Sequence, residues 1–249
     1  MASPLLIPPP ALEWLLGADP AAVLVIGAAG GYPSLIAQAG HDVTVIERQE
    51  TLAGHLAERR PDLHMTVARG EALPFDPCCF DAVVSFQNFH TFAPGLALSE
   101  WARVLRPGGW VSLAYLKRDD SIPWVKRLAG IVQSRLPEAM RGKYGDGSMV
   151  GLEQSPYFPT SQRRNFRIWA PCDRADLQGQ ASRAKGNERL SAAERGAMLE
   201  EVGKLYDACA RVPDPLQLPY SLTCCRGVVD HAELTAALVP DQDGLRLTL

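Results

Sequence analysis

The chain has 249 residues, of which 47% are hydrophobic and 21% are charged, and these proportions exclude a protein that is disordered throughout. Its net charge of −3 hides a basic middle, residues 116–195, and because that block has no interleaved aromatic repeats we expect no nucleic-acid partner. There is no apolar run of about 18 residues and no signal-peptide pattern at the start, so we expect a cytoplasmic protein that does not contact a membrane.

Short apolar runs alternate with helical segments from residue 22 onward. The predicted strands are 22–26, 42–46, 64–68, 81–86 and 109–116, and the predicted helices are 34–39, 49–59 and 96–105. This alternation predicts βαβ units, a parallel sheet and helices on both of its faces. Ligands of such sheets bind at the carboxyl ends of the strands, where the segments after the first four strands, 27–31, 47, 69–71 and 86–92, should converge.

The pattern becomes looser after residue 116. We expect a helix at 122–136, an irregular lid at 137–165, a strand at 166–170, a helix at 191–211 and a last strand at 216–225, antiparallel at the sheet edge. Ser191 and Glu194 fit a capping box at the start of the last helix. The sequence thus predicts one α/β domain, 1–249, with a doubly wound, mostly parallel sheet of seven strands, a lid half at 117–238 and a loose tail at 239–249.

The six cysteines form no Cys-x-x-Cys motif, and no histidine lies at zinc-finger spacing from them. The sequence therefore predicts no metal site. Neighbouring residues on a strand point to opposite faces, so Cys224 and Cys225 cannot easily bond to each other. We expect all six cysteines to be reduced, as in the cytoplasm.

A glycine-rich turn follows the first predicted strand, in the run V-L-V-I-G-A-A-G-G-Y-P. Its glycines allow close approach of a ligand to the backbone, and Glu47, at the end of the second strand, can accept hydrogen bonds from ribose hydroxyls. Both features suit a cofactor that contains adenosine. A dinucleotide fingerprint would need a glycine in place of Ala29 and a small residue in place of Tyr32, so a nicotinamide-dependent oxidoreductase is the weaker alternative.

Further motifs give the chain a family resemblance. They are G-A-A-G-G at 27–31, G-H-D-V-T-V-I-E at 40–47, G-E-A-L-P-F at 70–75, F-D-A-V-V at 80–84, Q-N-F-H-T-F at 87–92 and R-V-L-R-P-G-G at 103–109. In this order and spacing they resemble class I S-adenosylmethionine-dependent methyltransferases with a Rossmann-like fold, especially the small bacterial type related to trans-aconitate methyltransferases. The resemblance makes residues 22–116 the half that binds the cofactor.

The resemblance implies that S-adenosylmethionine is the cofactor. The residues expected to hold it are Gly27, Ala28, Ala29, Gly30, Gly31, Glu47, Arg48, Gly70, Glu71, Phe86 and Gln87. His90, just past the fourth strand, is the candidate for contact with the substrate and for a general base, and a structural histidine is the alternative. Arg118 and Arg167 in the basic block are candidates for binding a carboxylate on the substrate.

We therefore expect a methyltransferase that acts on a small-molecule acceptor, for which a carboxylate is one option. Two positions depart from the family pattern, because Val25 stands where an acidic residue is usual and Ala29 where a glycine is usual. These departures support a second hypothesis, a non-catalytic binding or scaffold protein with the same fold. The short segment before the first strand leaves apolar surface that a second subunit of a homodimer could cover.

Overall fold

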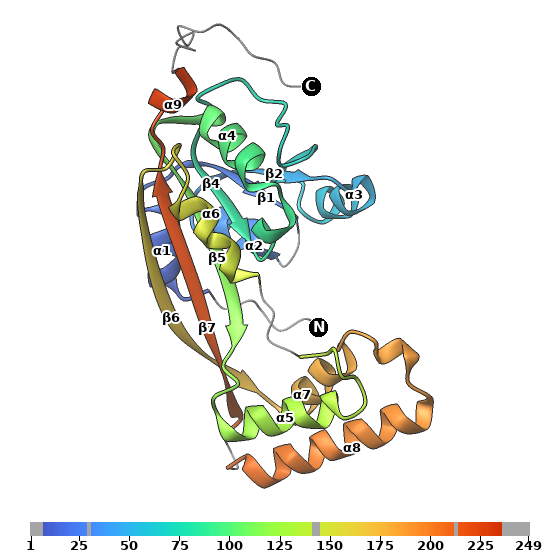
Figure 1. The fold of residues 1–249 in the computed structure, drawn as a ribbon. Helices are drawn as coiled ribbons and strands as arrows, with labels where there is room; N and C mark the ends of the chain where they lie inside the picture. Colours follow the sequence, from blue (N-terminus) through green and yellow to red (C-terminus); the bar gives the residue numbers. More distant parts are fainter. Residues whose placement is uncertain (1–6, 29–30, 141–144, 212–213, 236–249) are drawn as a thin grey trace, which may run out of the picture.

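The computed structural model describes residues 7–28, 31–140, 145–211 and 214–235. Seven strands form one sheet in the order β3-β2-β1-β4-β5-β7-β6 (Figure 1). They are β1 (Ala22–Ile26), β2 (Asp42–Glu47), β3 (His64–Val67), β4 (Phe80–Phe86), β5 (Leu105–Arg118), β6 (Thr160–Cys172) and β7 (Leu216–Val228). The predicted α/β class and seven-stranded, mostly parallel sheet are confirmed, whereas the predicted tail at 239–249 lies outside the described residues.

Helices connect the strands. The α-helices are α1 (Pro9–Leu16), α2 (Tyr32–Gln38), α3 (Glu50–Arg59), α4 (Pro94–Val104), α5 (Pro123–Gln133), α6 (Val150–Glu153), α7 (Arg174–Ser182), α8 (Ala192–Cys209) and α9 (Ala232–Thr235). Short 3-10 turns are η2 (Phe89–Thr91), η3 (Asp146–Met149) and η4 (Asn187–Arg189). As the sequence predicted, Ser191 caps α8 and forms a capping box with Glu194.

The first five strands pair in parallel, and β7 pairs antiparallel with both β5 and β6. The prediction of an antiparallel last strand is confirmed, but its place at the edge is wrong because β6 lies outside it. The fifth strand also begins earlier than predicted, at Leu105. The glycine-rich residues 106–109 interrupt its pairing with β4, since Phe80 pairs with Leu105 and Ala82 with Trp110.

Alternation along the strands gives the sheet two buried faces. Leu24 and Ile26 of β1 face a core that includes residues of α4 and α6, whereas Val23 and Val25 face a second core that includes residues of α1 and α2. Side chains of successive strand residues point to opposite faces, which is why helices must cover both sides. Cys224 and Cys225 of β7 lie in different cores for the same reason, as predicted.

A third core lies beyond the carboxyl ends of β5 and β6, and Cys172 of β6 and Leu218 of β7 also belong to it. There α5, α7 and α8 pack against one another, below the sheet in Figure 1, and we call them the helical unit. The predicted irregular lid at 137–165 is therefore too long, because η3 and α6 form within it and β6 already begins at Thr160. Strand β6 was missed over residues 160–165 because these edge residues are polar and mostly exposed.

The N-terminal helix α1 is anchored at its last turn. Its Leu15 carbonyl accepts hydrogen bonds from Trp110 Nε1 at 2.8 Å and from Ser112 Oγ at 2.6 Å, and the Trp14 carbonyl accepts one from Arg226. Side chains of β5 and β7 thus satisfy carbonyls that have no partner inside the helix. Within the described part of the chain, no helix combines the length and apolar character needed to cross a bilayer.

Candidate functional site

A cavity of about 430 Å³ opens where β1, β2 and β4 end. Its walls come from the ends of these strands, from the start of α3, from residues after β3 and from η2. The lining residues are Ile26, Gly27, Ile46, Glu47, Arg48, Gln49, Leu52, Ala68, Arg69, Gly70, Glu71, Asn88, Thr91 and Phe92. The volume lies in the range of pockets that hold small molecules. We refer to it as the strand-end cavity.

Glu47 is buried beside the glycine turn. Its Oε2 accepts a hydrogen bond from the backbone N–H of Ala28 at 3.0 Å, and its Oε1 accepts one from Gln49 at 3.0 Å. Each carboxylate oxygen has a second lone pair, so both can accept a further hydrogen bond from a ligand. The side chain faces the cavity as the sequence predicted, and it also ties the glycine turn to the end of β2.

Asn88 closes the turn from the side of β4. Its Nδ2 donates to the carbonyl of Ile26 at 2.7 Å, and its Oδ1 accepts from the buried Ser85 hydroxyl. Gly27 has φ +95°, and a Cβ there would collide with the Asn88 amide, so a glycine is required for two independent reasons. Sequence reasoning included Asn88 only within a motif and did not identify it as a site residue.

Gly70 also lines the strand-end cavity. A Cβ at this position would lie 2.9 Å from Phe92 and 3.2 Å from Ile26, closer than side chains tolerate. Its carbonyl accepts a hydrogen bond from Trp101 Nε1 at 2.8 Å, and the indole is fully buried against Phe92. The predicted residue Glu71 also lines the cavity and lies 3.8 Å from the guanidinium of Arg69.

Five of the predicted cofactor residues line this cavity: Gly27, Glu47, Arg48, Gly70 and Glu71. Four others do not line it: Ala28, Gly31, Phe86 and Gln87. Phe86 stacks on the buried Tyr32 with ring centroids 4.1 Å apart, and Gln87 donates to the Leu116 carbonyl at 3.0 Å. Gln87 also has φ +61°, a conformation that non-glycine residues seldom adopt outside functional or strained sites. Ala29 and Gly30 lie outside the described residues.

None of the three predicted substrate residues lines the strand-end cavity. His90 is exposed on η2, between the lining residues Asn88 and Thr91, and its ring contacts Tyr115 of β5. Arg118 is paired with Asp120 through two hydrogen bonds of 2.5 and 3.0 Å. Arg167 lies on the edge strand β6 and is paired with Asp119 at 2.7 Å. Neither guanidinium lines the strand-end cavity.

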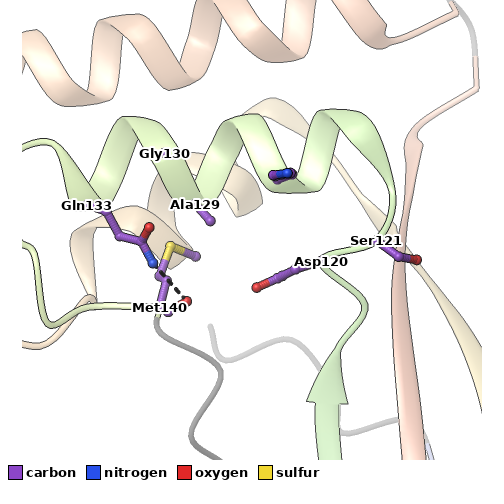
Figure 2. Close-up of a pocket in the computed structure, with 7 residues that line it drawn as sticks. Asp120, Ser121, Ala129, Gly130, Gln133 and Met140 are labelled. Carbon is purple, nitrogen blue, oxygen red and sulfur yellow. Dashed lines mark hydrogen bonds between the residues drawn. The ribbon is translucent and has the colours of Figure 1, made fainter.

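A second cavity of about 580 Å³ lies along α5, on the side away from α8 (Figure 2). Its walls are Asp120, Ser121, Lys126, Ala129, Gly130, Gln133 and Met140. The residues from α5 recur with helical spacing, so they form one face of that helix. The amide of Gln133 donates to the carbonyls of Ala139 and Met140, which fixes the far wall of this cavity.

The strand-end cavity fits the adenosyl part of S-adenosylmethionine. Glu47 has acceptor capacity left for ribose hydroxyls, and glycines at 27 and 70 allow a ligand close to the backbone. The apolar side chains of Ile46 and Leu52 offer surface for a flat base. No group of three or more side chains able to bind a metal occurs among the residues described.

The sheet order, the glycine turn and the acidic residue at the end of β2 define a class I methyltransferase fold. The family model of the methyltransferase domain matches residues 24–113, so this part of the chain is similar to methyltransferase domains. The matched segment contains the whole strand-end cavity. The finer resemblance to trans-aconitate methyltransferases stays a prediction.

Relatives and solved structures agree with this assignment. The chain is 34% identical over 126 residues to uncharacterized methyltransferase Rv3342 of Mycobacterium tuberculosis, covering 50% of this chain and 52% of that protein. It is 30% identical over 132 residues to uncharacterized methyltransferase C25B8.09 of Schizosaccharomyces pombe, covering 51% of this chain and 53% of that protein. The chain thus spans about half the length of the curated relatives it matches.

Two solved structures share the fold. A candidate type II methyltransferase from Anaeromyxobacter dehalogenans is similar with a TM-score of 0.64 and 19% identity, covering 89% of this chain and 96% of that one. A candidate methyltransferase from an antibiotic biosynthesis pathway of Anabaena variabilis gives a TM-score of 0.56 and 16% identity, covering 86% and 94%. At these identities the likeness concerns the fold alone.

Proposed function

We propose that this protein is an S-adenosylmethionine-dependent methyltransferase that binds its cofactor in the strand-end cavity and methylates a small molecule. The observation that carries the proposal is the position of Glu47, which faces the cavity and also holds the glycine turn. A cytoplasmic location is part of the proposal, and the six free cysteines support it. Val25, the main departure from the family pattern, is buried in a core face of β1.

In this proposal the residues of the chain bind the cofactor and orient it for methyl transfer. Bound S-adenosylmethionine supplies a methyl group on a positively charged sulfur, which is a strong electrophile. Glu47 holds the ribose, Asn88 fixes the turn at Gly27, and the fully buried Trp101 fixes the wall at Gly70. Positioning of this kind contributes most of the catalysis when the electrophile is already reactive, because the acceptor must only be held in line with the breaking bond.

The acceptor is the finer part of the proposal. A carboxylate acceptor stays a prediction, and it would need Arg118 or Arg167 to leave its aspartate partner. In the second cavity, Lys126 has no carboxylate partner among the residues described and is available for an anionic group. A carboxylate would need no base, whereas a hydroxyl or amine acceptor would use His90.

Ligand-dependent unfolding tests the cofactor site. S-adenosylhomocysteine, the demethylated product, should stabilise the fold by about 2.7 kcal/mol at about 100 times its dissociation constant, which raises the melting temperature by several degrees. Glu47→Gln should weaken binding by roughly 10- to 150-fold, because it removes hydrogen bonds to a charged acceptor worth about 1.5–3 kcal/mol. Differential scanning calorimetry and isothermal titration measure the two effects.

The matched control is Glu50→Gln, an exposed residue of α3 that does not line the cavity. This variant should bind S-adenosylhomocysteine with the same dissociation constant as the wild-type protein. Since Glu47 also accepts two backbone hydrogen bonds, the unfolding free energy of each variant without ligand is measured in parallel. A wild-type protein that millimolar S-adenosylhomocysteine does not stabilise would contradict the proposal and favour a non-catalytic role for the fold.

A further inference from the structure

A chain of hydrogen bonds links His90 to a buried tyrosine and to the η3 turn. Tyr115 Oη accepts the backbone N–H of His90 at 2.9 Å and lies 3.2 Å from Nδ1 of the same histidine. The same hydroxyl lies 3.2 Å from Ser148 Oγ, and Ser148 donates to the carbonyl of Gly145 at 2.6 Å. Tyr115 is fully buried, whereas the His90 side chain is exposed.

The chemistry of these groups fixes the direction of the chain. A carbonyl oxygen can only accept a hydrogen bond, so the Ser148 hydroxyl must be the donor in its contact with the Gly145 carbonyl. Since this proton is used, Ser148 Oγ must be the acceptor in its contact with Tyr115, and the Tyr115 hydroxyl donates to it. The Tyr115 oxygen then accepts a hydrogen bond from Nδ1–H of His90. This assignment gives every contact one proton, whereas a Tyr115 that donates to Nδ1 would leave lone pairs facing each other at Ser148. Burial raises the pKa of Tyr115, so its hydroxyl keeps the proton that it donates.

The turn that ends the chain is held in place by independent contacts. Tyr115 and Lys117 point to the same face of β5, and Lys117 forms an ion pair of 2.7 Å with Asp146 in the same turn as Ser148. Gly145 has φ +79°, and a Cβ there would collide with the His90 ring. Met149 is fully buried in the core beside α4. These contacts hold the η3 turn in one position against the His90 ring.

We propose that Tyr115 and Ser148 hold the His90 imidazole in the Nδ1–H tautomer, so that Nε2 keeps its lone pair and acts as the general base for an acceptor whose attacking atom carries a proton. This inference rests on the proposed methyltransferase function and names its substrate class, a hydroxyl or an amine. Tyr115 and Ser148 are positioning residues that act through His90. A histidine whose free nitrogen is fixed as an acceptor needs no tautomer change before it takes a proton.

The transfer step balances in atoms and charge. The acceptor's lone pair forms the new bond to the methyl carbon, and the electron pair of the broken sulfur–carbon bond stays on sulfur. The proton that the acceptor loses passes to Nε2 of His90. Because the His90 side chain is exposed, the imidazolium can return this proton to water.

Nitrogen NMR of the protein without any ligand tests the tautomer directly. The ring nitrogens of His90, assigned by comparison with His90→Gln, should show a protonated Nδ1 and an unprotonated Nε2 at neutral pH. Tyr115→Phe and Ser148→Ala should each shift the balance toward Nε2–H, and Ser148→Thr, which keeps the hydroxyl, should retain Nδ1–H. The matched control is Ser134→Ala, which removes the exposed hydroxyl of the C-cap residue of α5, a donor to the Ile131 carbonyl. A wild-type His90 in the Nε2–H form would overturn the proposal.

Kinetic measurements then test whether Tyr115 and Ser148 position His90 for catalysis or only stabilise the fold. With a hydroxyl or amine acceptor, Tyr115→Phe should lower kcat by up to about 100-fold, the low end of what a positioned base contributes, with KM for S-adenosylmethionine unchanged. Ser148→Thr should rescue most of the loss caused by Ser148→Ala. An unchanged kcat in a folded Tyr115→Phe protein would overturn the base role. If S-adenosylhomocysteine fails to bind although the tautomer is as expected, the proposed function fails and the tautomer assignment stands.

Discussion

His41 is a buried titratable group between α2 and β2, at the opposite end of β2 from Glu47. Its side chain is only 9% exposed, and its Nδ1 has no hydrogen-bond partner in the described structure. Burial disfavours the charged imidazolium and lowers the pKa of His41 below its ordinary value of 6.5. The unfolded chain therefore binds a proton at a higher pH than the folded protein does.

The sign of the resulting pH dependence follows from linkage. Between the lowered folded pKa of His41 and 6.5, the unfolded state carries more protons, so the free energy of unfolding should fall as the pH decreases below 6.5. His41→Gln should make this fall smaller, as measured by urea denaturation over a pH series. His55→Gln, which changes an exposed histidine of α3, is the control and should keep the wild-type slope. Equal slopes in the wild-type and His41→Gln proteins would rule out this role.

Single residues of the site could be predicted only where their role follows from their position in the local sequence. Glu47 could be found because an acidic residue at the end of the second strand has few roles other than ligand binding in this architecture. Asn88 could not be singled out, because an asparagine after a strand is common in turns. Its role depends on the pairing of β4 with β1, which brings the Ile26 carbonyl within reach, and this long-range contact leaves no local signal in the sequence.

At the scale of elements, helix α4 holds the segment 70–75, whose first two residues line the strand-end cavity. Glu100 accepts the backbone N–H of Leu73 at 2.7 Å, and the guanidinium of Arg103 donates to the carbonyls of Leu73 and Phe75. Arg103 is also paired with Glu100 at 2.7 Å, which lowers the pKa of that carboxyl. Two motifs that the sequence placed far apart, G-E-A-L-P-F and R-V-L-R-P-G-G, thus form one structural unit.

Arg103→Met should therefore loosen the cavity wall. It removes hydrogen bonds from a charged donor to backbone carbonyls, and we expect a loss of about 1–3 kcal/mol in the free energy of unfolding. Amide hydrogen exchange should become faster over residues 70–75, and S-adenosylhomocysteine should bind more weakly. Arg106→Met is the control, because its ion pair with Asp81 is exposed to solvent and should contribute little to stability. Unchanged exchange at 70–75 would show that the wall does not depend on Arg103.

The elements themselves were predictable to very different degrees. Strands β1, β2 and β4 are continuous buried runs, and their predicted bounds differ from the structure by at most one residue. Helix α7 was missed, because its capping box uses Asp173 and Asp176 instead of the serine and glutamate pattern. The length of β6 could not be predicted, since pairing with β7 and not its own polar sequence extends it to Thr160.

The described part of the molecule combines a sheet that has a core on each face with a helical unit that packs around a third core. Leu128 of α5, Leu177 of α7 and Val202 of α8 are fully buried in that third core, and no residue that lines the strand-end cavity belongs to it. Regions with separate cores can open separately, with free energies below that of global unfolding. We infer that the helical unit opens without the sheet and that cofactor binding does not depend on the helical unit.

A leucine truncation in each region tests this division. Leu128→Ala should remove about 2–5 kcal/mol from the stability of the helical unit and speed amide exchange in α5, α7 and α8, while exchange in β1 and β4 stays slow. The dissociation constant of S-adenosylhomocysteine should not change, because the cavity walls stay intact. Leu113→Ala, an equally buried change on β5, is the matched control and should speed exchange throughout the sheet. If Leu128→Ala speeds exchange in β1 as much as in α5, the two regions unfold as one, and the site depends on the helical unit for its stability.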